Sequence, residues 1–443
     1  MKESLHMNAT RWIICLLAAL ALPAQVQAQT PTTEADWVRL ALDRDATLAA
    51  QRHDTLAAGQ AVEVSRAGLW PTVQLSAEDG RRERRDRPES IFQPHTGSRP
   101  SDQQSITLTQ MLYDGHRTRK EIQSAELRVA QQNVRLRKVA NERAAAVLQV
   151  WHQWRAARSA WQAHRVAEGE LRQLVTVVTQ RLEAGRAAEV DLRRAESRWL
   201  DGQRTVAESQ ARWREASVAL ISLAGVDPSQ PEAHAPVFSP LAPGSAAALR
   251  EQCRTGCPGV VESELQLERG RAELAAARAG HHPRITLEAS HAHARNPNGS
   301  AERYLSRSLM IKASWTLFEG GGRSAQVAQV AHSVDGLGQQ VDEARRESLM
   351  QFDQALVRYE DAIDQHALAE RTANVSREAL RLARLAFEAG RRQAIEVADV
   401  IAEAARAADE AARRDAQRWI ERDRLLASAG VLLDQLGVVL RPA

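Results

Sequence analysis

An internal duplication at a fixed spacing constrains the fold of this chain more than any other feature. The turn Tyr113-Asp114-Gly115 is matched by Phe318-Glu319-Gly320 at an offset of 205, and Leu182 to Arg186 is matched at the same offset by Phe387 to Arg391. Each copy therefore holds an aromatic-acidic-glycine turn, a long stretch of helical pattern, and then Glu-Ala-Gly-Arg. A repeat of this length predicts two related structural units in one chain.

The boundaries of the two units follow from the repeat and from a proline-rich stretch. Arg66 to Gly68 is matched by Arg278 to Gly280 at an offset of 212, and Gly225 is matched by Gly437 at this same larger offset. Because Gly437 keeps the larger offset, we predict that the last helix has gained one heptad and reaches that glycine. We expect a first repeat over 29–225, a linker over 226–245, a second repeat over 246–437 and a short tail over 438–443.

The N-terminal stretch 1–28 has the pattern of a secretory signal peptide. Arg11 precedes an apolar core of about eleven residues, and Val26-Gln27-Ala28 forms a cleavage site. The alternative, a membrane anchor, would need roughly 20 apolar residues. Cys15 lies inside the apolar core and away from the cleavage point, so we do not expect it to be lipidated. The sequence therefore predicts export.

Export bears on the two remaining cysteines, Cys253 and Cys257. The periplasm is oxidising, so a disulfide is their expected state. A zinc site would need more ligands than one cysteine pair supplies.

The hydropathy pattern predicts helices interrupted by two β-hairpins. Apolar residues recur at three- and four-residue steps over 35–66, and long helices are expected over 114–225 and 319–437. Alternation with a period of two predicts hairpins at about 72–113 and 284–318, with the arginine-rich stretch 81–100 as a loop. The longest helical segment would span about 105 Å at about 1.5 Å per residue. The two shorter helices of a repeat, laid end to end, would match it, as in a tube of uniform wall.

Two stretches of the first long helix predict how helices pack. The apolar residues recur at a/d-like spacing, which indicates seams between neighbouring helices rather than a ligand site. They are Trp151, Trp154 and Trp161, followed by Leu171, Leu174 and Val178.

Four strands of about ten residues match the thickness of the apolar layer of a bilayer when they are tilted. A barrel made by one chain has at least about eight strands. Open strand edges in lipid leave backbone groups unpaired, at several kcal/mol each, so strands that span would have to be pooled by several chains. The alternative is a small soluble sheet. After residue 28 no stretch has the roughly 18 apolar residues of a spanning helix.

Charge and motifs exclude several classes of function. A net charge of +3 is too small to indicate a nucleic-acid binder. Nucleophile elbows, phosphate loops and metalloprotease histidine pairs do not occur, so we expect no enzyme, no cofactor and no metal. His291 and His293 lie on one face of a strand, either as a loose metal site or as polar strand positions. The arginines of 81–87 face either anionic lipid or sugar groups, or only solvent.

One group of acidic residues stands near the second Glu-Ala-Gly-Arg motif. Glu396 and Asp399 are three positions apart, so a helix presents both carboxylates on one face, and Asp191 follows the matching turn of the first copy. In one chain this is a solvated face. Repeated by symmetry around a tube, it would form a ring that attracts cations.

Taken together, these motifs resemble the TolC family of outer-membrane channels over essentially the whole mature chain. The resemblance implies an α+β membrane protein, in which duplicated helical hairpins form a periplasmic α-barrel. It implies a homotrimer whose four strands per chain build one twelve-stranded barrel in the outer membrane of a Gram-negative bacterium. It also implies partners: outer-membrane lipid, a periplasmic adaptor, and an inner-membrane ABC exporter or proton-driven pump.

The resemblance carries roles onto particular residues. Glu396 and Asp399 match the acidic constriction at the entrance, while Asp191 and Arg392 match the polar lock that keeps the entrance closed. Phe387 takes the place where the lock can carry a tyrosine, so that hydroxyl is missing here. The tips that would meet the adaptor include Gly185, Arg186, Gly390 and Arg391.

We therefore expect a passive exit duct. The turn Tyr113-Asp114-Gly115 with Arg117-Thr118, and the lack of a lipidation cysteine, lean towards type I protein secretion. Efflux of drugs or other small molecules is the alternative within the family. An alternative of another class is a periplasmic coiled-coil adaptor or scaffold that never spans a membrane.

Overall fold

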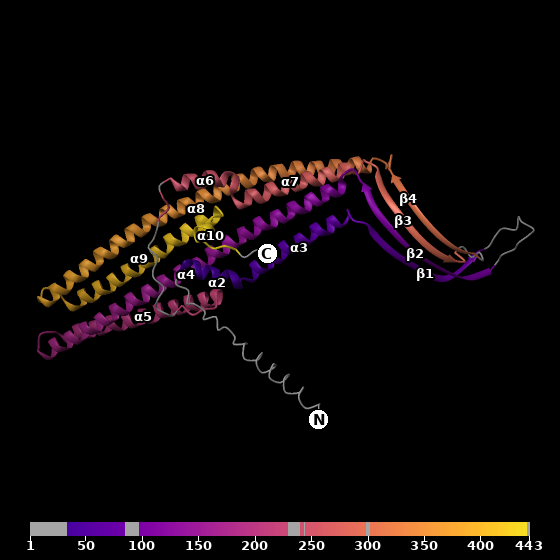
Figure 1. Ribbon diagram of the computed structural model, residues 1–443. Helices are drawn as coiled ribbons and strands as arrows, with labels where there is room; N and C mark the ends of the chain where they lie inside the picture. Colours follow the sequence, from indigo (N-terminus) through magenta and orange to yellow (C-terminus); the bar gives the residue numbers. More distant parts are fainter. Residues whose placement is uncertain (1–32, 85–96, 229–239, 243, 298–301, 441–443) are drawn as a thin grey trace, which may run out of the picture.

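The computed structural model describes residues 33–84, 97–228, 240–242, 244–297 and 302–440. It is an elongated molecule, with long helices running side by side and a curved sheet at one end (Figure 1). The predicted signal peptide and most of the predicted linker lie outside the described residues. Within the described ranges, none of the helices has an apolar stretch long enough to cross a bilayer.

The same series of elements occurs twice. The first half holds α2 (Glu34–Arg44), α3 (Ala46–Ala67), β1 (Thr72–Arg84), β2 (Gly97–Tyr113), α4 (Arg117–Glu183) and α5 (Glu189–Ala224). The second half holds α6 (Ser245–Gly256), α7 (Pro258–Ala279), β3 (Arg284–Arg295), β4 (Arg303–Ser314), α8 (Gly322–Glu388), α9 (Ala394–Ser428) and the short α10 (Leu432–Gln435). Helices α4 and α8 both have 67 residues, and α3 and α7 both have 22. The predicted duplicated α+β fold is confirmed.

The single helix predicted over 35–66 is wrong, because the chain bends at Asp45. This residue is extended, with φ −70° and ψ 113°, and its Oδ1 accepts a hydrogen bond of 2.8 Å from the backbone N–H of Leu48. Asp45 thus caps α3, as acidic residues do at helix N-termini. Cys257, its equivalent at the offset of 212, is extended in the same way before α7, and a disulfide joins it to Cys253. The two bends are equivalent in shape and different in chemistry.

The last long helix ends earlier than predicted. Helix α9 stops at Ser428, and Gly430 follows with φ +76°. Its equivalent at the offset of 205 is Gly225, which ends α5 with φ +68°. The repeat therefore keeps the offset of 205 to its end, and the predicted extra heptad up to Gly437 is not there. Glycine takes these positions because positive φ strains any residue with a Cβ.

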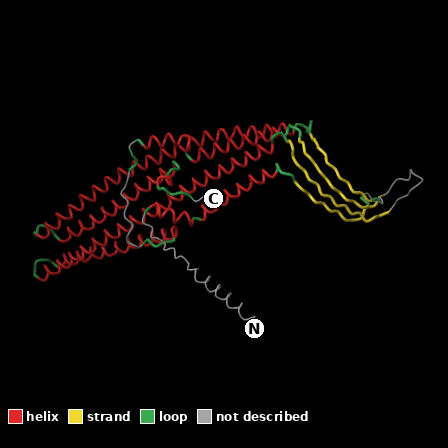
Figure 2. The backbone as a smooth tube through the Cα atoms, in the orientation of Figure 1, coloured by secondary structure: helices red, strands yellow, loops and turns green. Residues whose placement is uncertain are grey.

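The four strands, drawn in yellow in Figure 2, form one antiparallel sheet. Their order is β1-β2-β3-β4. Pairing runs from Thr72 with Thr109 out to Arg84 with Gly97, so residues 81–84 and 97–100, predicted as loop, are strand. Alternation of apolar and polar residues fades there, while the backbone ladder continues. The offset of the repeat falls from 212 to 205 across the hairpins, because the second hairpin is shorter.

The two faces of the sheet differ in polarity. One face, the apolar face, carries exposed large side chains from β1, β2 and β4: Val73, Leu75, Ile106, Leu309 and Ile311. The other, the polar face, carries hydroxyls and charges, such as the paired Ser76 and Ser105, whose Oγ atoms are 2.7 Å apart. On that face Lys312 Nζ also donates to Glu288 Oε2 at 2.6 Å. A sheet with these two faces suits a boundary between lipid and water.

Helix α9 packs against both α4 and α8 and thereby joins the two repeats. The predicted seams are confirmed: Trp151 and Trp154 are 1% and 2% exposed, and Trp161 stacks on Trp213 with 4.8 Å between ring centroids. Leu171, Leu174 and Val178 are buried in a second cluster near the tips. The C-terminal segment packs on α2 and α4, where the backbone N–H of Leu433 donates to Asn141 Oδ1 at 3.1 Å.

Candidate functional site at the helix tips

The end of the molecule opposite the sheet consists of two helical tips, α4–α5 and α8–α9 (Figure 1). Gly185 and Gly390 turn the chain at these tips, with φ +70° and +71°. In each, the backbone N–H of the next arginine donates across the turn, from Arg186 to Arg181 O at 2.7 Å and from Arg391 to Ala386 O at 2.8 Å. A Cβ added to either glycine would meet no atom within 4 Å. Glycine is required here for its backbone conformation, not for space.

Phe387 lies in the core of the tips rather than on their surface. It is 8% exposed and packs in a cluster with Leu174, Val178 and Val397. The guanidinium carbon of Arg181 lies 4.1 Å from the centroid of its ring, and Arg181 Nη2 donates to Phe387 O at 3.2 Å. This cation–π contact ties the first repeat to the second. Sequence reasoning missed Arg181, whose repeat equivalent is Ala386.

Glu396 and Asp399 are half-exposed on α9, and each has an arginine partner. Their side chains are 51% and 53% exposed. Arg392 Nε lies 3.6 Å from Glu396 Oε2, within one helix. Arg198 Nη2 of α5 lies 3.0 Å from Asp399 Oδ1, which links the repeats. Sequence reasoning also missed Arg198.

The predicted partners Asp191 and Arg392 do not meet within one chain. Asp191 lies in the first turn of α5, and among the described residues the acid beside Arg392 is Glu396. In this structure, therefore, Asp191 and Arg392 of one chain do not form an ion pair with each other.

A groove above the tips runs between α4 and α8, over α9. Its volume is about 790 Å³, and charged side chains gather in it, including Arg377, Arg381 and Arg384. Arg384 of α8 forms an ion pair with Glu170 of α4 across this groove. With the Arg198–Asp399 pair, it makes two ionic ties between the repeats near the tips.

Farther from the tips, a buried cluster of titratable side chains lies between α2, α4 and α9. His152 Nε2 is 3.1 Å from Asp423 Oδ2 and 4.0 Å from Glu34 Oε1, and the side chains of His152 and Asp423 are 0% and 1% exposed. Burial lowers the pKa of His152 to about 3 and raises the pKa of Asp423 to about 7. Burial also raises the pKa of Glu34. A second buried pair, His164 Nε2 and Asp409 Oδ2 at 3.4 Å, lies nearer the tips.

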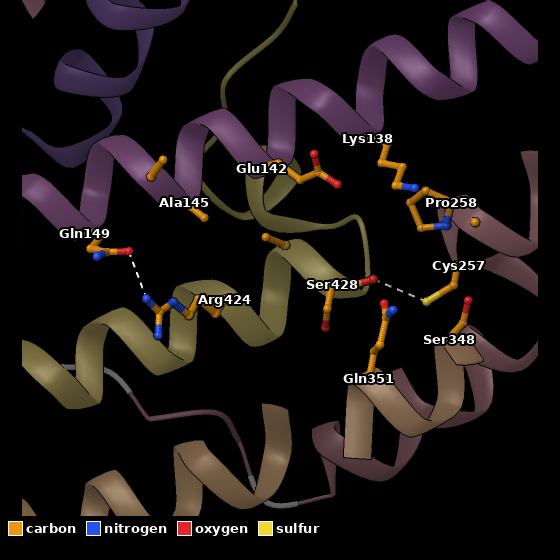
Figure 3. Close-up of a pocket in the computed structure, with 13 residues that line it drawn as sticks. Lys138, Glu142, Ala145, Gln149, Cys257, Pro258, Ser348, Gln351, Arg424 and Ser428 are labelled. Atoms are coloured by element: carbon orange, nitrogen blue, oxygen red, sulfur yellow. Dashed lines mark hydrogen bonds between the residues drawn. The ribbon is translucent and has the colours of Figure 1, made fainter. Parts of the chain in front are cut away.

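A hollow of about 380 Å³ lies where α4, α7, α8 and α9 approach one another (Figure 3). Gln149 Oε1 accepts a hydrogen bond of 2.9 Å from Arg424 Nη2 on one side. On the other, Cys257 Sγ lies 3.3 Å from Ser428 O. Within the described ranges, no group of three or more His, Cys, Asp or Glu side chains is placed to hold a metal ion, and His291 and His293 are exposed strand residues.

Comparison with known proteins agrees with this architecture. Residues 37–226 and 249–431 match the family described as outer membrane efflux protein. Protein CyaE of Bordetella pertussis is 31% identical over 191 residues, which cover 43% of this chain and 39% of CyaE. The alignment thus covers less than half the length of that relative.

Solved structures show the same fold. A membrane protein from Pseudomonas aeruginosa superposes with a TM-score of 0.74 at 21% identity, over 90% of both chains. The outer membrane protein VceC of Vibrio cholerae gives 0.73 at 13% identity, over 90% of this chain and 96% of VceC. The MtrE outer membrane channel of Neisseria gonorrhoeae, solved in an open state, gives 0.73 at 18% identity, over 91% and 90%.

The family match covers both repeats, from α2 to beyond α5 and from α6 to the end of α9. The chain therefore belongs to the outer membrane efflux protein family, a family of outer-membrane proteins.

Proposed function

We propose that three copies of this chain form a passive exit duct. In it, twelve pooled strands cross the outer membrane and the helices enclose a periplasmic tunnel. The duct itself is passive, so the energy for export comes from a partner in the inner membrane.

The proposal rests on a helix–helix interface that the first repeat forms within the chain. The equivalent surface of the second repeat is left exposed. Helix α4 is covered within the chain by α9 and α7. Its repeat equivalent α8 packs on α9 and α7 on one side, and elsewhere presents exposed apolar residues. They are Met350, Val357, Leu368, Val375, Leu382 and Leu385, each more than half exposed. Exposed apolar area of this kind marks an interaction surface.

The repeat indicates what covers that surface. By analogy with α4, the equivalents of α9 and α7 are α5 and α3, and within the chain those helices lie against α4 instead. A second copy can supply them. The sheet has the same need, because β1 and β4 are edge strands and unpaired edges are costly in lipid. Closure into a ring satisfies both requirements.

We assign the entrance of the duct to the tips. Three copies of Glu396 and Asp399 would form an acidic ring that favours cations, and Asp191 would meet Arg392 of a neighbouring subunit as a lock. The tips around Gly185, Arg186, Gly390 and Arg391 would contact the periplasmic adaptor. Opening would separate the α8–α9 pair from the α4–α5 pair, and so break the Arg198–Asp399 contact.

The cargo class is a further part of the proposal, and we assign it to proteins exported by an ABC transporter. The motif around Tyr113 and Arg117 supports this choice, although part of that motif has a local role. Asp114 Oδ2 accepts hydrogen bonds from the backbone N–H of Thr118 at 2.9 Å and from its hydroxyl at 2.5 Å. Small-molecule efflux with a proton-driven pump is the second candidate, and the efflux description of the family favours it.

Conductance of the purified trimer in planar bilayers tests the duct and its lock. Arg392→Ser should raise the open-channel current, because it removes the cation of the proposed lock. Arg391→Ser, at the adjacent position and outside the lock, is the matched control and should leave the current unchanged. A protein that purifies as a detergent-free monomer would refute the duct, and equal currents in both variants would refute the lock alone.

Deletion of the gene in its native host distinguishes the two cargo classes. Loss of a protein from the culture medium, with unchanged drug tolerance, supports protein export. A fall in drug tolerance with an unchanged set of secreted proteins supports small-molecule efflux.

A further inference from the structure

We propose that the outer end of the apolar sheet face binds the phosphate groups of anionic lipid in the outer leaflet. The proposal rests on the proposed function, because it requires β1–β4 to lie in the outer membrane. The site comprises five basic residues of β3 and β4, here called the basic rim: His291, His293, Arg295, Arg303 and Arg307.

The strand register places these residues on one face. Across β3 and β4, Ala289 pairs with Leu309, His291 with Arg307, His293 with Leu305, and Arg295 with Arg303. Side chains alternate between faces along a strand, so all of these pairs share the face that carries Leu309 and Ile311. Every residue of the basic rim is exposed. Along its length, the apolar face thus passes from aliphatic side chains to the basic side chains of the rim.

The height of the rim coincides with the outer edge of the apolar layer. Trp70 and Trp315, 72% and 60% exposed, lie beside the helix end of the sheet, as aromatic residues do at a membrane interface. A strand that rises about 3.4 Å per residue at a tilt of about 40° climbs about 2.6 Å per residue. Arg307 then stands about 21 Å above Trp315 and Arg303 about 31 Å, on either side of the edge of an apolar band about 25 Å tall.

Arg307 gives the strongest indication of a ligand. It lies between Leu305 and Leu309, which are 57% and 72% exposed on the same face. An arginine facing lipid is unfavourable unless its guanidinium reaches a polar partner. In the described part of the chain, no carboxylate forms an ion pair with any arginine of the rim. Asp79 and Asp102 share the row of Arg295 and Arg303, and the row of Arg307 and His291 contains no acid.

The chemistry of the rim matches phosphate. Guanidinium groups bind phosphate oxygens in a bidentate manner, and imidazole N–H groups donate to them. A long arginine side chain can extend from the apolar band to the headgroup level. Phosphorylated lipid of the outer leaflet presents anionic groups at that level, so a lipid held there would be an annular ligand of each subunit.

Native mass spectrometry of the detergent-solubilised trimer tests the proposal, with diphosphoryl lipid A as the probe. The double variant Arg303→Gln/Arg307→Gln should bind at least tenfold less tightly than the wild type. The control is Arg82→Gln/Arg99→Gln, which removes two arginines paired with each other on the polar face, three positions beyond the row of Arg295 and Arg303. The control should bind lipid A like the wild type.

Three outcomes would overturn the proposal: unchanged binding by the double variant, an equal loss in the control, or retention of dephosphorylated lipid A as tightly as the diphosphoryl form. Inorganic phosphate at the same concentration should not displace the lipid, and displacement would assign the rim to free phosphate instead. Both variants should still conduct as trimers in bilayers. If the wild type neither trimerises nor conducts, the proposed duct fails, whatever the rim binds.

Discussion

The two helix tips have the same backbone and carry different charges. Both turn at a glycine with φ near +70°, yet the side chains at equivalent positions have diverged. Glu396 corresponds to Asp191, Asp399 to Arg194, and Arg392 to Ala187. The duplication preserved the turn, which depends on one backbone conformation, while the side chains changed with their surroundings. We interpret the second tip, with its paired acids, as the one that faces the passage.

The same comparison can be made halfway along the helices. His152 of α4 is buried beneath α9, whereas its equivalent Val357 of α8 is 56% exposed. Equivalent positions thus differ in burial, because the first is covered by a helix of the same chain, whereas the second lies on the surface that we propose is covered by a second subunit. Four predictions, in decreasing order of magnitude, test this contrast between the repeats.

The largest effect is expected from His152→Ala. It leaves Asp423 Oδ2 buried without its hydrogen bond to His152 and opens a cavity where the ring was, which should lower the free energy of unfolding by about 3 kcal/mol. Val357→Ala at the equivalent position should change the unfolding of the chain by less than about 0.5 kcal/mol and should instead weaken the trimer. Chemical denaturation followed by circular dichroism measures the first effect, and trimer retention on unheated SDS gels the second. Equal unfolding effects would contradict the contrast.

A smaller effect is expected when pH is varied in Asp423→Asn. The pKa of His152 is about 3 in the fold against an ordinary 6.5, so His152 costs stability as pH falls from about 6.5. The pKa of Asp423 is about 7 against an ordinary 3.8, so Asp423 adds stability as pH falls from about 7. The two contributions oppose each other in the wild type.

Without Asp423, less of the stability that His152 loses on acidification is offset by proton uptake at a neighbouring carboxylate. The variant should therefore lose stability on acidification more steeply than the wild type, by at most about 1.4 kcal/mol per pH unit between pH 6.5 and 4. Melting temperatures at half-unit steps of pH check this. Parallel curves for variant and wild type would show that Asp423 takes up no proton in that range.

Gly185→Ala and Gly390→Ala should each cost about 1 kcal/mol, because a Cβ is strained at positive φ. The costs should be equal, since an added Cβ would meet no atom within 4 Å at either glycine. The control Gly336→Ala, in open space inside α8, should instead stabilise by up to about 1 kcal/mol. Thermal unfolding compares all three, and a clear difference between the two tips would show that their turns are not equivalent.

The smallest effect is expected on ion selectivity. Glu396→Gln with Asp399→Asn should lower the preference for cations and weaken block by divalent ions, whereas Asp191→Asn in the first repeat should change both less. Reversal potentials in a salt gradient measure the preference. Stability should change by less than about 1 kcal/mol, because these ion pairs are half-exposed. Unchanged selectivity in the double variant would remove the ring from the proposal.

Much of the fold was predictable because it follows from the spacing of the internal repeat and from the periodicity of apolar residues. The repeat offset located both tips, alternation with a period of two located both hairpins, and the spacing of Trp151 and Trp154 identified a buried seam. The break at Asp45 was missed because the apolar period continues through it, while the helix cap depends on one side chain. The outer ends of β1 and β2 were missed because backbone pairing persists where side-chain alternation has ended.

The site was less predictable because its contacts join distant segments. Nothing in the local sequence connects Arg181 with Phe387, or Arg198 with Asp399, which lie in different repeats. The available signal was asymmetry between the repeats, since Ala386 and Glu403 stand where a strict repeat would have placed arginines. Comparison of the two copies for such differences would have identified both residues.

The bends before α3 and before α7 are stabilised by different chemistry, so they can form under different conditions. The bend before α3 needs only the carboxylate of Asp45, so it can form wherever the helices fold. The bend before α7 is closed covalently between Cys253 and Cys257, and such a bond persists only outside the reducing cytoplasm. The covalent closure of the second bend is therefore expected only after the chain has left the cytoplasm.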